Sequence, residues 1–173
     1  MLQCFYPDRY IRSAYEIDYE AYYRAGYRGI IFDIDNTLVE HGAPADDRSI
    51  ALMEQLKQLG FKIMLLSNNK EPRVKMFNDA VQVSYIFKAG KPGRRGYEEA
   101  MRQMGTDQKT TLFVGDQLFT DVWGANKTGI ESYLVKPIDK HEEVQIVLKR
   151  MLEKPVLACY KRKCRKEKSR KHE

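Results

Sequence analysis

The chain has 173 residues, 43% of them hydrophobic and 31% charged, which is the balance of a globular protein long enough to bury one substantial core. Three cysteines are too few for a disulfide framework, and no apolar run approaches the roughly 18 residues that a bilayer span needs. The opening MLQCFYPDRY lacks the basic and apolar segments of a secretory signal, so we expect a cytoplasmic protein.

The net charge of +6 is distributed unevenly along the chain. Residues 154–173 contain nine Lys or Arg and two Glu, a net charge of +7, so the remaining residues carry a net charge of −1. Because a run of like charges repels itself, we expect one folded domain at 1–155 and a disordered basic tail at 156–173. Such a tail is either a solvated terminus or is attracted to an anionic partner, such as lipid headgroups or RNA.

Strand and helix patterns alternate along the folded part. Residues 1–27 predict an extended lead-in and a short helix that ends at Gly26. Short apolar runs, as found in strands buried on both faces, then alternate with segments of helical spacing. The predicted strands are 29–32, 62–67, 83–87, 111–115 and 131–135, and the predicted helices are 48–60, 71–80, 94–105, 121–129 and 141–152.

This regular alternation predicts an α/β fold. We expect a three-layer, Rossmann-like domain with a parallel sheet of about five strands and helices on both faces. The active crevice of such a sheet lies at the carboxyl ends of its strands. Asp33, Ser67 and Asp116 each follow an apolar run, and Lys91 comes a few residues after the run at 83–87. This edge of the sheet is therefore the candidate site.

Several carboxylates are expected at that edge. Asp33, Asp35, Asp116 and Asp121 would raise one another's pKa values unless a cation lay among them. All are oxygen donors, with no His or Cys offered beside them, and hard oxygen ligands in small number suit Mg²⁺. The sequence thus predicts a magnesium site that takes a substrate phosphate oxygen as a further ligand.

A hydroxyl and a positive charge complete this predicted site. Ser67 supplies the hydroxyl, and Lys91 supplies a compact charge that neutralises phosphoryl oxygens. An aspartate beside Mg²⁺ can attack phosphorus and form an aspartyl-phosphate. A second carboxyl group can protonate the leaving alkoxide and then deprotonate the water that hydrolyses the intermediate. The predicted chemistry is phosphomonoester hydrolysis.

Each of these residues also has an ordinary structural explanation when it is considered alone. Asp35 and Asn36 suit a helix cap or a turn, Ser67 and Asn68 suit a turn after a strand, and Lys91 suits a solvated lysine. Their order along the chain, more than any single residue, supports the catalytic interpretation.

Four segments, DIDNT at 33–37, LLSNN at 65–69, GKP at 90–92 and GDQLFTD at 115–121, resemble the four motifs of the haloacid dehalogenase-like (HAD) phosphatase superfamily. The resemblance implies that Asp33 is the nucleophile and that Asp35 is the general acid/base, which also ligates Mg²⁺ through its backbone carbonyl. The remaining implied roles are phosphate binding by Thr37, Ser67, Asn68 and Lys91, and metal binding by Asp33, Asp35, Asp116 and Asp121, with Asp121 either supporting the metal or orienting Lys91.

The spacing of the motifs leaves no room for a cap domain. Only 29 residues separate Thr37 from Ser67, and 23 separate Ser67 from Lys91. An open site predicts either a substrate presented on something large or an oligomer that supplies a lid.

Residues 5–150, including GYRGIIFDIDNTLV and AGKPGRRGY, further resemble the YqeG-type group of the capless subfamily IIIA. Relatives of that group include phosphatidylglycerophosphate phosphatases, which implies a lipid phosphate substrate and a peripheral position at the membrane. Two alternatives stay open: the same chemistry on a protein or nucleic-acid phosphate, and a ribosome- or RNA-associated binding protein that kept the fold.

Overall fold

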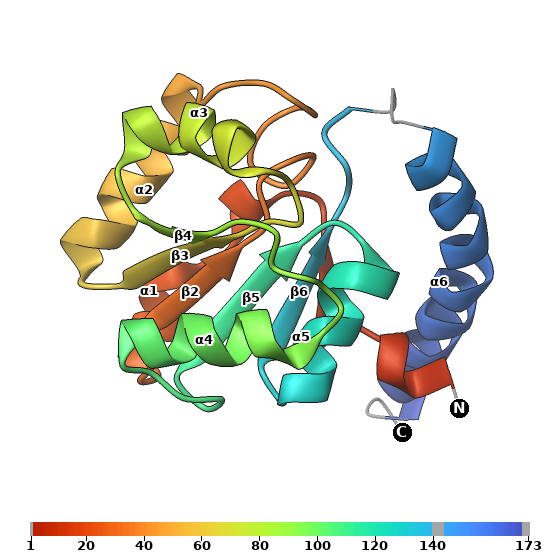
Figure 1. Ribbon diagram of the computed structural model, residues 1–173. Coiled ribbons are helices and arrows are strands. Elements are labelled where there is room, and N and C mark those ends of the chain that lie inside the picture. Colours follow the sequence, from red (N-terminus) through yellow and green to blue (C-terminus); the bar gives the residue numbers. More distant parts are fainter. Residues whose placement is uncertain (1, 140–143, 171–173) are drawn as a thin grey trace.

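The computed structural model describes residues 2–139 and 144–170, and its centre is a parallel sheet of six strands (Figure 1). The strands lie in the order β1-β6-β5-β2-β3-β4, so the sheet extends from β2 toward β3 on one side and toward β5 on the other. Ligands of open α/β sheets bind at such a switch point. The strands are β1 (Arg9–Ile11), β2 (Gly29–Phe32), β3 (Lys62–Leu66), β4 (Ser84–Ile86), β5 (Thr111–Gly115) and β6 (Glu131–Val135).

Helices cover both faces of the sheet, which confirms the predicted three-layer α/β fold (Figure 1). One face packs against α1 (Tyr19–Arg24), α2 (Asp47–Leu59) and α3 (Glu71–Val81) through a core that contains Leu56 and Phe77. The other face packs against α4 (Arg94–Met104) and α5 (Trp123–Thr128). Only α2 and β3 lie between residues 38 and 66, so this stretch holds no cap domain.

Local sequence signals explain where the elements begin and end. All four residues of β2 are buried, as expected for a strand covered on both faces. Helix α2 begins with a capping box, in which the Asp46 side chain accepts the backbone N–H of Ser49. The same helix ends at Gly60, whose φ of 94° is a left-handed conformation that favours glycine. These ends agree with the predicted segments.

The first strand was not expected from the sequence. Residues Arg9–Ile11 pair in parallel with β6, with Arg9 opposite Tyr133, and make the sixth strand of the sheet. The strand is three residues long and only partly buried at the edge, so it has neither an apolar run nor a clear alternation.

The C-terminal segment also differs from the expectation of a disordered tail from residue 156. Helix α6 runs from Val144 to Arg170, while 140–143 and 171–173 lie outside the described residues. One stripe of the helix recurs at intervals of three or four residues and is buried or half-buried. Its members are Glu153, Val156, Leu157, Tyr160 and Cys164. Burial of this stripe outweighs the repulsion among the exposed basic side chains, of which Lys161 and Lys163 lie over the rings of Tyr10 and Tyr6.

The stripe joins α6 to the rest of the domain. Val156 packs in a small core with Leu118, Val122 and Leu134, beside the single π-helical turn Leu118–Val122 that precedes α5. Within 2–139 and 144–170, no helix combines the length and apolarity that a membrane span requires.

Candidate active site

The nucleophile predicted from the sequence lies at the centre of the sheet. Asp33 directly follows β2, and Phe32 before it pairs with Leu65 of β3 and with Val114 of β5. The backbone N–H of Asp33 donates to the carbonyl of Val114 at 2.9 Å. Because strands on both sides hold this backbone, the position of the Asp33 carboxylate is fixed by the sheet itself.

Lys91 joins two carboxylates at the strand ends. Its ammonium nitrogen donates to Asp33 Oδ1 at 2.6 Å and to Asp121 Oδ1 at 2.7 Å. The other oxygen of Asp121 accepts the backbone N–H groups of Asp116 at 3.1 Å and Gln117 at 3.0 Å. The Asp121 carboxylate therefore bonds both the loop after β5 and Lys91, and its role, metal support or orientation of Lys91, stays a prediction.

Burial changes the pKa values of Asp33 and Lys91. Loss of solvent raises the pKa of Asp33 to about 7, against the opposing effect of the Lys91 charge and with a further rise from Asp121. Burial disfavours the charge on Lys91, but Asp121 and Asp33 more than offset this and raise the pKa of Lys91. Lys91 is thus cationic at neutral pH, and Asp33 is close to its midpoint in the protein alone.

Three carboxylates gather closely enough to share a cation. Asp33, Asp116 and Asp121 are all buried, and each offers an oxygen within 4.8 Å of the others. Thr37 Oγ1 donates to Asp116 Oδ1 at 3.3 Å and helps to orient that carboxylate. The cluster contains one lysine and three carboxylates, so it keeps a negative charge when all three carboxylates are ionised. An all-oxygen set of this charge fits a divalent metal ion.

The turn after β3 supplies two more predicted residues. Ser67 is buried, and its Oγ accepts the backbone N–H of Asn69 at 3.1 Å. The side chain of Asn68 instead clamps the backbone of Lys91: Oδ1 accepts its N–H at 2.8 Å, and Nδ2 donates to its carbonyl at 3.0 Å. Asn68, predicted to bind phosphate, thus positions Lys91 in this structure.

Asp35 points to different partners from Asp33. It is not a member of the carboxylate cluster around Lys91. Its Oδ1 accepts N–H groups from Gly42 and Arg73, and its Oδ2 accepts one from Asn69. Sequence reasoning did not single out Arg73 or Asn69. Asn69 is the last residue of the LLSNN motif and Arg73 follows four residues later, but nothing in the sequence distinguishes Arg73 from a solvated residue at a helix start.

Comparison with known proteins identifies the family. The chain is 36% identical over 160 residues to a protein named "Probable phosphatase YqeG" from Bacillus subtilis (strain 168), and the match covers 92% of this chain and 93% of that protein. It is 27% identical to phosphatidylglycerophosphate phosphatase 1 (chloroplastic/mitochondrial) of Arabidopsis thaliana. That match covers 92% of this chain but only 48% of the plant protein, which is about twice as long as the shared region.

A family model described as "HAD-hyrolase-like" matches residues 88–145, which include Lys91 and Asp116. The fold is also found in a solved HAD superfamily (subfamily III A) hydrolase from Legionella pneumophila, with a TM-score of 0.53 and 15% identity, over 70% of this chain and 72% of that one. The extent and identity of the Bacillus match show that this chain belongs to the YqeG-type group of the HAD superfamily of phosphatases.

Proposed function

We propose that the chain is a Mg²⁺-dependent phosphomonoester hydrolase that works through an aspartyl-phosphate on Asp33. The observation that carries this proposal is the buried cluster at the strand ends, where Lys91 lies 2.6 Å from Asp33 and Asp116 and Asp121 offer oxygens close by. A buried nucleophile beside a fixed cation is suited to a phosphoryl group, whose charge both the lysine and a metal ion can neutralise.

In the proposed reaction, a carboxylate oxygen of Asp33 forms a bond to phosphorus while the ester P–O bond breaks. The leaving alkoxide takes a proton from Asp35. A water then attacks the phosphorus of the aspartyl-phosphate and gives its proton to Asp35, so Asp33 and phosphate are released and Asp35 regains the proton it lost. Lys91 and Ser67 hold the phosphoryl oxygens during both steps.

The metal ligands in this proposal are the carboxylates of Asp33 and Asp116 and the backbone carbonyl of Asp35, with Asp121 behind them. When bound there, Mg²⁺ would supply positive charge that offsets the carboxylates and the phosphoryl oxygens. The fit rests on the all-oxygen donor set and on the excess of carboxylates over lysine in the cluster.

For the substrate we propose phosphatidylglycerophosphate or another phosphate presented at a membrane surface, which places the protein at the cytoplasmic face of a membrane. The name of the plant relative supports this substrate. Exposed apolar residues on the outer face of α6 support the proposed position at a membrane surface. Leu148 is 60% exposed, and Met151 and Leu152 are each 59% exposed. Exposed basic side chains continue along the helix at Lys154, Lys161, Arg162, Lys163, Arg165 and Lys166.

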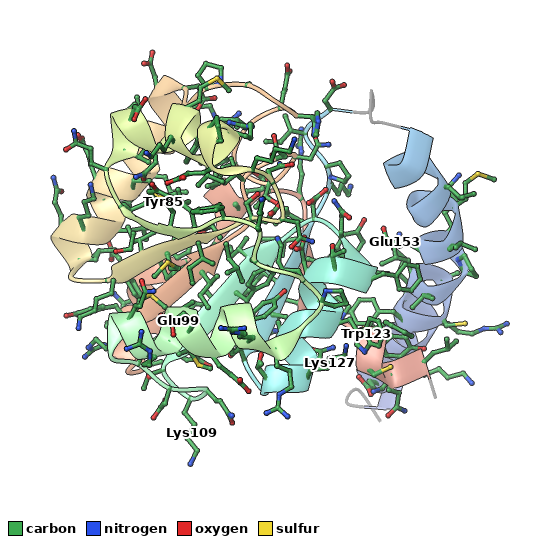
Figure 2. The ribbon with its side chains drawn as sticks, in the orientation of Figure 1. Tyr85, Glu99, Lys109, Trp123, Lys127 and Glu153 are labelled. Carbon is green, nitrogen blue, oxygen red and sulfur yellow. The ribbon has the colours of Figure 1, made fainter. Side chains whose placement is uncertain are left out.

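An apolar face followed by basic residues is typical of helices that lie in the interface of an anionic bilayer. Each basic residue near such a surface contributes about 1 kcal/mol of attraction. Helix α6 is also joined to the catalytic edge, because Glu153 on its inner side accepts the backbone N–H of Leu118 at 2.7 Å (Figure 2). Leu118 lies two residues after Asp116, so α6 is attached to the loop that carries one of the site's carboxylates.

Phosphate release tests the chemistry. Wild type is expected to hydrolyse p-nitrophenyl phosphate with Mg²⁺, to lose this activity in EDTA, and to be inactive as Asp33→Asn. If wild type and Asp33→Asn were equally inert with Mg²⁺ present, the enzymatic proposal would fail. Phosphatidylglycerophosphate in mixed micelles, compared with phosphopeptide and nucleotide substrates, then tests the substrate.

Vesicle flotation tests whether the protein binds a membrane surface. We expect the full chain to bind vesicles that contain phosphatidylglycerol, and the triple change Leu148→Ser, Met151→Ser and Leu152→Ser to weaken that binding. Met76→Ser is the matched control, because Met76 is an exposed apolar residue on α3. The nucleic-acid alternative would be favoured if the triple variant bound vesicles as wild type does and if removal of residues 158–173 abolished RNA binding.

A further inference from the structure

The carboxylate of Asp35 is held by a second ion pair that lies apart from the Lys91 cluster. Arg73, at the start of α3, donates to Asp35 Oδ1 from Nη2 at 2.9 Å and from Nε at 3.2 Å. We propose that Arg73 is the positioning residue for Asp35, holding its carboxyl group where a proton can pass to the leaving oxygen. This inference rests on the proposed phosphatase function.

Three residues from two segments of the chain, the loop at Gly42 and the stretch 69–73, donate hydrogen bonds to the Asp35 side chain. The backbone N–H of Gly42 donates to Oδ1 at 2.7 Å, and Asn69 Nδ2 donates to Oδ2 at 2.7 Å. Arg73 adds a formal positive charge, and a charge-assisted hydrogen bond is about twice as strong as a neutral one. The Asp35 side chain is only 12% exposed and that of Arg73 only 14%, so water screens this pair weakly. Of these contacts, the one with Arg73 is therefore the strongest restraint on Asp35.

The contacts with Asp35 do not use all the hydrogen-bond donors of Arg73. Within the described ranges 2–139 and 144–170, its Nη1 is the single buried side-chain nitrogen or oxygen that has no hydrogen-bond partner. Leaving a buried donor unpaired costs about 1–3 kcal/mol, and more for a charged group. The position of Arg73 therefore satisfies the Asp35 side chain and leaves one of the donors of Arg73 itself without a partner.

The position of Asp35 matters for one part of the chemistry in particular. An alkoxide leaves only if it receives a proton, and proton transfer needs the donor oxygen within about 2.6–3.2 Å of the leaving oxygen. A p-nitrophenolate group is stable enough to leave without a proton. Loss of the Arg73 contact should therefore slow the release of alkyl groups much more than the release of p-nitrophenolate.

The experiment compares the first turnover of two substrates, p-nitrophenyl phosphate and glycerol 3-phosphate, with enzyme in excess and Mg²⁺ present. Arg73→Ala should slow the glycerol 3-phosphate reaction by about 10- to 100-fold and the p-nitrophenyl phosphate reaction by less than about threefold. Added guanidinium should restore part of the lost rate, and Arg73→Lys should retain part of it. Lys75→Ala is the matched control, because Lys75 lies on the same helix and pairs with Glu71 at the surface.

Other outcomes would overturn the proposal. Equal losses for both substrates would indicate a general structural role. A higher half-saturating enzyme concentration with an unchanged maximal rate would indicate substrate binding, and unchanged rates would indicate no role. If Arg73→Ala did not melt cooperatively, Arg73→Lys and Arg73→Gln would be compared by the same ratio of rates. A failure of the proposed function is distinguishable, because wild type and Lys75→Ala would then match Asp33→Asn on both substrates.

Discussion

The ammonium group of Lys91 lies 2.6 Å from the carboxylate of Asp33, and their side chains are only 4% and 10% exposed. The two residues are 58 positions apart in the chain and meet because β2 and the loop after β4 end at the same edge of the sheet. Asp121 shares the same lysine at 2.7 Å. The energetics of the site therefore depend on one buried cation among several carboxylates.

Removal of that cation should be costly for stability. We expect Lys91→Met to lower the free energy of unfolding by about 3–5 kcal/mol, because Asp33 and Asp121 would be left as buried charges without their partner. Urea unfolding in EDTA measures this change. Lys88→Met is the control, since Lys88 is exposed in the same loop, and equal stabilities of the two variants would contradict the prediction.

The pKa of Asp33 predicts a pH dependence for the metal-free protein. Its value of about 7 in the folded state lies above the usual 3.8, so its contribution to stability is full below about pH 4 and is lost as the pH rises through 7. Between about pH 5.5 and pH 8, wild type should lose on the order of 2 kcal/mol of unfolding free energy relative to Asp33→Asn. Urea unfolding at both pH values, in EDTA, gives the difference.

The exposed residue Asp79 on α3 provides the control for this pH dependence. Asp79→Asn should follow the wild-type pH profile. A wild-type profile parallel to that of Asp33→Asn across this range would show that Asp33 does not carry the predicted change.

Gly124 allows α5 to approach Tyr97 closely. A Cβ atom at this position would lie 2.5 Å from ring atoms of Tyr97, which is fully buried and donates its hydroxyl to the Asp121 carbonyl at 3.0 Å. Glycine to alanine inside a helix usually stabilises by about 1 kcal/mol. Here we expect Gly124→Ala to destabilise by about 1–3 kcal/mol, because the ring cannot move freely.

Thermal melts and a double-mutant cycle with Tyr97→Leu measure this effect. The cost of Gly124→Ala should shrink when the Tyr97 ring is absent. An increase in Tm for the single variant would contradict the close packing seen here.

Glu153 ties α6 to the catalytic loop, and its removal should loosen that helix. We expect Glu153→Ala to cost about 1–3 kcal/mol, because the buried N–H of Leu118 loses an acceptor. Limited proteolysis within 154–170 should become faster in the variant. Glu167→Ala, at an exposed position of the same helix, should digest like wild type. Equal digestion of both variants would indicate that other contacts hold α6.

The architecture was largely readable from the sequence. The strands at 29–32, 111–115 and 131–135 agree with β2, β5 and β6 residue for residue, because each is a short, largely apolar run, although 131–135 begins with Glu131 and Ser132. The edge strand β1 and the length of α6 were not predicted. Both depend on contacts with distant residues, β1 on β6 and α6 on Leu118, Val122 and Leu134.

The sequence by itself determined the order of the strands and helices along the chain and the polar residues that follow the strands, since apolar periodicity and spacing are local properties. The tertiary structure decided how those residues combine: Asp121 with Lys91, Asn68 with the Lys91 backbone, and Asp35 with Arg73. Hydrogen bonds between residues far apart in the chain depend on the twist of the sheet and on helix packing. Those features set the position of each side chain to within a fraction of an ångström, and no pattern of residue types along one segment encodes them.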